Sequence, residues 1–89
     1  MIARHFIVSG VVQGVAFRWA TKQTADRLGV AGWVRNKPDG SVEAWVETDP
    51  DLMAQFEDWL REGPMGARVS GLVSDEAVAV GLEGFEIRY

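Results

Sequence analysis

The sequence contains no cysteine and a single histidine, His5. Without cysteine the chain has no disulfide, no thiolate nucleophile and no cysteine metal ligand, which is typical of a reducing compartment. One histidine cannot form the clusters of transition-metal sites, which leaves open only a weak Mg²⁺ site made of carboxylates. We expect no metal site and no cofactor. No apolar run approaches the ~18 residues of a membrane span, and the N-terminus shows no leader pattern. We therefore expect a cytoplasmic protein with no membrane partner.

Basic residues are also in the minority, with nine Lys and Arg against thirteen Asp and Glu and a net charge of −4. This balance disfavours a nucleic-acid partner, which normally requires a basic domain. Residues 18–37, however, hold five of the nine basic residues and one acid, so this segment is cationic in an anionic chain. Its charge is typical either of solvated helix and strand faces or of a site that attracts a small anion.

The stretch Ser9–Trp19, SGVVQGVAFRW, favours the second interpretation. The residues before it, 6–8, have the pattern of a strand, and Phe17 begins a series of apolar residues at helical spacing. A loop between a strand and a helix directs consecutive backbone N–H groups and the positive end of the helix dipole toward one place. A phosphate or carboxylate can bind there, and Arg18 would add a charged donor.

The remaining patterns predict a domain with five strands and two helices. We expect strands over residues 2–12, 30–36, 41–47, 68–74 and 85–89, and helices over 17–28 and between Asp49 and Gly63. Residues 75–84 show no clear pattern. The order βαββαβ with a short last strand predicts an α+β, ferredoxin-like sandwich. In this fold two helices cover one face of an antiparallel sheet of four or five strands.

Each predicted element has one apolar face. The first helix has an inner stripe made of Phe17, Thr21, Thr24, Ala25 and Leu28, and the second has one made of Leu52, Phe56, Trp59 and Leu60. In the strand over 41–47, alternation puts Glu43, Trp45 and Glu47 on a solvated face. We expect the tryptophans to be packing residues, with Trp45 as a partly exposed exception.

Few residues offer catalytic chemistry. His5 lies in the middle of a strand, with no hydroxyl or acid at the spacing of a triad, and Asp49 and Asp51 resemble helix caps. No pair of carboxylates can be placed across a cleft, and no nucleophile stands out. What remains is the loop that ends at Arg18 and the end of the second strand, where Asn36 precedes a predicted hairpin turn.

These two segments carry a resemblance to the acylphosphatase family. GVVQGVAFR is followed eighteen residues after Arg18 by Asn36 in GWVRNKPDGSVE, and LMAQFEDWLREGP, GARVS and FEIRY extend the resemblance over nearly the whole chain. Two departures are visible: Ala16 stands where glycine is common, and Thr48 to Pro50 stand where the family usually has a glycine. The resemblance implies one acylphosphatase-like domain over residues 1–89.

The resemblance implies hydrolysis of acyl phosphates to carboxylate and inorganic phosphate, without a metal. It implies that Arg18 binds the phosphoryl group and that Asn36 positions the attacking water, a role that an amide can fill by accepting and donating hydrogen bonds. The phosphate oxygens would also accept hydrogen bonds from the backbone N–H groups of Gln13, Gly14, Val15, Ala16 and Phe17.

Two other functions are compatible with part of this pattern. An RNA-recognition domain has the same βαββαβ order, but its third strand needs stacking aromatic and basic residues, whereas here Trp45 lies between two glutamates. A non-catalytic module that binds small anions could use the same fold and would need Arg18 but not Asn36. We expect an enzyme that acts as a monomer on a small acyl phosphate.

Overall fold

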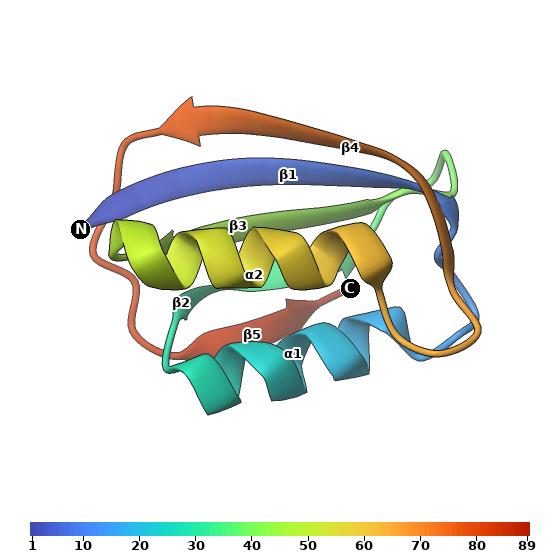
Figure 1. Ribbon diagram of the computed structural model, residues 1–89, viewed down its shortest axis with the longest axis horizontal. Helices are drawn as coiled ribbons and strands as arrows, with labels where there is room; N and C mark the ends of the chain where they lie inside the picture. Colours follow the sequence, from blue (N-terminus) through green and yellow to red (C-terminus); the bar gives the residue numbers. More distant parts are fainter.

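Five strands form one sheet, and two helices lie side by side over one of its faces (Figure 1). A computed structural model describes residues 1–89. Along the chain the elements are β1 (Ile2–Val11), α1 (Phe17–Leu28), β2 (Ala31–Asn36), β3 (Val42–Thr48), α2 (Pro50–Glu62), β4 (Arg68–Ala77) and β5 (Phe85–Arg88). The predicted α+β, ferredoxin-like fold is confirmed. No helix combines the length and the apolar composition needed to cross a membrane.

The strand order across the sheet is β4-β1-β3-β2-β5. All neighbouring strands are antiparallel except β2 and β5, which are parallel. The prediction of an antiparallel sheet is therefore wrong for this one pair. The reason is topological: β4 and β5 occupy opposite edges, so the chain between them crosses the sheet and enters β5 at the end where β2 also begins. The N–H of Gly32 donates to the carbonyl of Gly84 at 2.9 Å at this entry.

The hydrophobic core lies between the sheet and the helices. Phe6 and Val8 of β1 face the helices, as do alternate residues of β3, and all are fully buried. The predicted stripe of α1 is confirmed for four residues, while Leu28 is half-buried at the margin of the core. In α2 the buried residues are Met53, Phe56 and Leu60. Met53 was not predicted, and Leu52 and Trp59 pack at the edge of the core.

The helix ends follow their capping residues. The Asp49 carboxylate accepts a hydrogen bond from the N–H of Leu52 at 2.9 Å, and Pro50 is the first residue of α2. Gly29 ends α1 in a left-handed conformation with a φ of 74°. These boundaries agree with the sequence prediction because each depends on a local residue preference.

The ambiguous stretch 75–84 divides into two parts. Residues 75–77 continue β4, so this strand is longer than predicted and pairs with β1 as far as Ala3 opposite Ala77. The next residues, 78–84, cross from β4 to β5 and carry no regular structure. We refer to residues 78–84 as the crossover.

Glu47 holds the crossover in place. Its carboxylate accepts hydrogen bonds from the N–H groups of Val80, Gly81 and Leu82 at 2.9–3.0 Å, and from Trp45 Nε1 at 2.9 Å. The residue is fully buried, so its predicted place on a solvated face is wrong. Burial acts to raise the pKa of Glu47, but these hydrogen bonds outweigh it and lower the pKa below its ordinary value.

Candidate active site

The site is built where β1 leaves the sheet. The pairing of β1 with β4 shifts register between Ser9 and Gly10, which is a β-bulge. Gly10 has a φ of 126°, and a Cβ there would lie 2.0 Å from the carbonyl oxygen of Arg68. Only glycine fits this position. The bulge therefore explains one of the glycines in the stretch Ser9–Trp19.

The loop between β1 and α1 presents backbone donors. Gly14 and Ala16 both have left-handed backbone conformations, with φ values of 76° and 58°. Ala16 is the N-cap residue of α1, and no side chain caps this helix end. None of the backbone N–H groups from Gln13 to Trp19 donates a hydrogen bond within the protein. The positive end of the α1 dipole and these N–H groups form the predicted environment for an anion.

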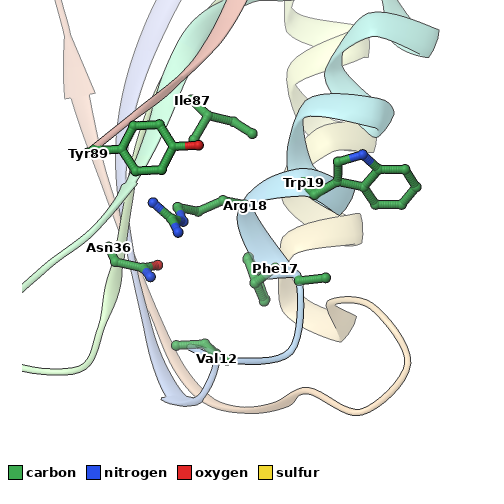
Figure 2. A pocket seen from close by; sticks show the side chains of 9 residues that line it. Val12, Phe17, Arg18, Trp19, Asn36, Ile87 and Tyr89 are labelled. Atoms are coloured by element: carbon green, nitrogen blue, oxygen red, sulfur yellow. The ribbon is translucent and has the colours of Figure 1, made fainter.

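A pocket of about 250 Å³ opens at this loop. Its lining residues are Val12, Gly14, Ala16, Phe17, Arg18, Trp19, Asn36, Ile87 and Tyr89. The structure thus brings together Arg18, Asn36 and three of the other residues predicted to hold phosphate. Gln13 and Val15 do not line the pocket. Figure 2 shows the side chains of Arg18 and Asn36 pointing toward one another, from α1 and β2 respectively.

Arg18 lies in the first turn of α1 and is half-buried. A cation at this end of a helix is unfavourable against the dipole, typically by about 0.3–1 kcal/mol. Its guanidinium forms no hydrogen bond or ion pair within the protein, and its carbon lies 4.7 Å from the centroid of the Tyr89 ring. All of its N–H donors are therefore free to bind a ligand.

Asn36 is the last residue of β2. Successive side chains of a strand point to opposite faces of the sheet. Asn36 therefore lies on the same face as the buried Val34, which faces the helices, and Arg35 between them is exposed on the other face. Its Oδ1 atom is buried and has no hydrogen-bond partner in the protein. A buried acceptor without a donor costs about 1–3 kcal/mol, so this atom adds nothing to stability and can accept a hydrogen bond from a bound molecule.

Gln13 connects the two halves of the site. Its Nε2 donates hydrogen bonds to the carbonyl oxygens of Lys37 and Ser41, at 2.8 and 2.9 Å. These carbonyls belong to the hairpin between β2 and β3, which is tightened because Asp39 accepts two hydrogen bonds from Ser41. The same bonds lower the pKa of Asp39, the one from the Ser41 hydroxyl most. The Gln13 side chain therefore fixes the loop relative to Asn36.

Four of the lining residues were not predicted as site residues: Val12, Trp19, Ile87 and Tyr89. Ile87 and Tyr89 reach the pocket because β5 runs parallel to β2. Arg88 pairs with Arg35, so the residue that follows β5, Tyr89, lies near the next residue along β2, Asn36. No sequence pattern indicates which strand becomes the neighbour of β2. Trp19 was expected to be a packing residue but is 61% exposed, and its ring points away from the pocket (Figure 2).

His5 takes no part in this pocket. It lies on the other face of the sheet, where its Nε2 is 2.6 Å from Glu43 Oε2. Arg35 pairs with the same carboxylate. Burial acts to raise the pKa of Glu43, but the hydrogen bonds from His5 and Arg35 outweigh it and lower the pKa. This cluster lies on the opposite face of the sheet from Asn36 and forms no part of the pocket.

The fold and pocket define a small α+β sandwich that gathers an arginine, an asparagine and free backbone donors at one loop. A family model described as acylphosphatase matches residues 4–87. An acylphosphatase of Rubrobacter xylanophilus is 51% identical over 82 residues, which are 91% of this chain and 74% of that protein. One of Thermococcus kodakarensis is 44% identical over 97% of this chain and 94% of that protein. The crystal structure of acylphosphatase from Bacillus subtilis has a TM-score of 0.97, with 33% identity and full coverage of both chains. The chain belongs to the acylphosphatase family.

Proposed function

We propose that this acylphosphatase hydrolyses acyl phosphates in the pocket between α1 and the end of β2. The N–H groups of residues 13–18 and the Arg18 guanidinium would hold the phosphoryl oxygens, and Asn36 would orient the attacking water. The observation that carries this proposal is the buried Asn36 Oδ1, which lacks a donor and lies in one pocket with an unpaired arginine. An acceptor in this position suits a water hydrogen, which leaves the water oxygen free to attack phosphorus.

The reaction balances without a further reactant. Water adds to phosphorus as the bond from phosphorus to the acyl oxygen breaks, and the carboxylate leaves with the bonding electrons. The water proton passes to a phosphate oxygen, so a dianionic acyl phosphate yields a monoanionic carboxylate and monoanionic phosphate. A carboxylate is a good leaving group and needs no general acid, so charge stabilisation and in-line placement are sufficient. We therefore propose that no metal takes part.

Substitution of the two site residues should separate binding from placement of the water. Arg18→Ala removes the main charge on the phosphoryl group, so both the affinity for substrate and kcat should fall, with about a 100-fold loss of kcat/KM. Asn36→Ala should lower kcat by about 100-fold and leave KM nearly unchanged, because the water loses its orientation. Phosphate release from acetyl or benzoyl phosphate, measured with chelator present, tests both changes.

Arg35→Ala is the matched control. Arg35 is an exposed cation beside Asn36 but on the opposite face of the sheet, so its loss should change kcat/KM by less than about two-fold, as expected for a surface pair. Absence of turnover by the wild-type protein would contradict the proposed activity. Full activity in both site variants would show that the residues are wrongly assigned.

We further propose that residues 1–89 act as one domain, as a monomer in the cytoplasm, without nucleic acid. The single hydrophobic core supports one domain, and the net charge of −4 disfavours a nucleic-acid partner. The absence of cysteine suits a reducing compartment such as the cytoplasm. Sedimentation across a range of concentrations tests the monomer, and cell fractionation tests the location.

A further inference from the structure

Tyr89 is an exposed aromatic residue with one side-chain partner. Its exposed fraction is 96%, so it contributes nothing to the core, and its hydroxyl forms no hydrogen bond within the protein. Its ring lies beside the guanidinium of Arg18, with the guanidinium carbon 4.7 Å from the ring centroid. Figure 2 shows the ring, Arg18 and Asn36 gathered on one side of the pocket. The contact places an aromatic face against the residue that holds the phosphoryl group in the proposed function.

The geometry of this contact leaves Arg18 free to bind. A guanidinium is planar, and its five N–H donors point outward in that plane. The π electrons of the Tyr89 ring attract the guanidinium charge, and the N–H groups of the Arg18 guanidinium form no hydrogen bond within the protein. A carboxylate partner would restrain Arg18 equally but would compete with phosphate for the same donors. The aromatic ring is thus a restraint that a phosphate does not have to displace.

Parallel pairing of β5 with β2 explains why this residue reaches Arg18. Phe85 and Ile87 face the helix layer, as alternate residues of a strand do, and Tyr89 continues the same side beyond the end of β5. The intervening Arg88 points to the opposite face and lies over Trp33, with 4.8 Å between the guanidinium carbon and the ring centroid. The last two residues therefore form two separate cation–π contacts on opposite faces of the sheet.

We propose that Tyr89 is a positioning residue, which holds the Arg18 guanidinium in the orientation that binds phosphate. This inference rests on the proposed role of Arg18 and deepens it. An exposed cation–π contact contributes about a two- to five-fold change in an equilibrium constant. Loss of the ring should weaken phosphate binding by that factor, and it should leave kcat within two-fold because placement of the water depends on Asn36.

The test is a set of substitutions read by NMR titration with inorganic phosphate and by acyl phosphate kinetics. Tyr89→Ala should raise both the Kd for phosphate and KM about two- to five-fold. Tyr89→Phe keeps the ring and should restore wild-type values, whereas Tyr89→Leu keeps only apolar bulk and should not. Arg88→Lys, which alters the contact on the opposite face and keeps the charge, is the matched control and should leave both constants unchanged.

Several results would overturn the inference. Wild-type phosphate affinity in Tyr89→Ala would show that the ring does not act on Arg18. Equal rescue by phenylalanine and leucine would show that bulk, not the aromatic face, is what matters. A higher KM with an unchanged Kd for inorganic phosphate would mean that Tyr89 touches the acyl group instead. Because the titration needs no turnover, it tests Tyr89 even if the wild-type protein releases no phosphate and the proposed activity fails.

Discussion

Ala16 is the one non-glycine residue of the chain with a positive φ. An L-residue in the left-handed region places its Cβ close to the backbone and costs about 1–2 kcal/mol. Ala16 is exposed, so its side chain makes no core contacts that would offset this free energy. The strained turn nevertheless exposes the N–H groups of the loop at the start of α1. Strain of this kind is common where backbone groups are arranged for a ligand.

Replacement of Ala16 by glycine should therefore stabilise the protein. Ala16→Gly relieves the left-handed strain but adds chain entropy to the unfolded state, so we expect a net gain of about 0.5–1 kcal/mol in the free energy of unfolding. Urea denaturation measures this difference. Ala20→Gly, in the interior of α1, is the control and should lose about 1 kcal/mol. A loss of stability in Ala16→Gly would contradict the assignment of strain to Ala16.

At the level of elements, the crossover depends on a single buried carboxylate. Glu47 supplies the acceptor for three consecutive N–H groups of a segment that has no regular structure of its own. The crossover carries the chain from one edge of the sheet to the other, and β5 follows directly. Glu47 thus acts indirectly on the site, because β5 presents Ile87 and Tyr89 to the pocket.

Acid should destabilise the fold through this carboxylate and two others. The pKa values of Asp39, Glu43 and Glu47 lie below their ordinary values in the folded protein. The unfolded chain, with ordinary values of about 3.9 for Asp and 4.3 for Glu, therefore takes up protons first as the pH falls. We expect the free energy of unfolding to be level above about pH 5 and to decrease below about pH 4.5. Urea denaturation between pH 7 and pH 3 measures this profile.

Glu47→Gln should remove part of that pH dependence and lower the free energy of unfolding at pH 7 by about 1–3 kcal/mol. One of the two carboxylate oxygens that accept N–H groups is then replaced by an amide NH₂, which can only donate. Hydrogen exchange should accelerate at Val80, Gly81 and Leu82. Glu83→Gln is the matched control, since Glu83 lies on the crossover but is exposed and forms no hydrogen bond. An unchanged pH profile in Glu47→Gln would contradict the role given to Glu47.

For the whole molecule, stability depends on the packing of the last strand, β5, at the edge of the sheet. Phe85 is the buried residue of β5, with 6% of its surface exposed, and its ring lies 6.0 Å from that of Phe56. The Phe85 carbonyl also accepts a hydrogen bond from Lys22 of α1 at 3.0 Å. The final segment of the chain thus joins both helices to the sheet.

Phe85→Ala should cost about 3–5 kcal/mol, the usual range for a buried phenylalanine. Small domains have about 5–15 kcal/mol in total, so this loss is a large part of the stability of an 89-residue chain. Urea denaturation measures the loss, and Glu86→Ala, an exposed neighbour, should change stability by less than about 0.5 kcal/mol. A small effect of Phe85→Ala would mean that the core does not need β5.

The sequence by itself determined the features that depend on neighbouring residues. Alternation and helical spacing, together with the caps at Asp49 and Gly29, indicated the elements, and the motifs around Arg18 and Asn36 indicated two segments that line one pocket, the proposed site. It could not indicate that Glu47 is buried, because the crossover that covers it has no pattern of its own. Only the tertiary structure decided that β5 pairs in parallel with β2 and brings Tyr89 to Arg18. Strand neighbours depend on packing between segments far apart in the chain, which no local pattern encodes.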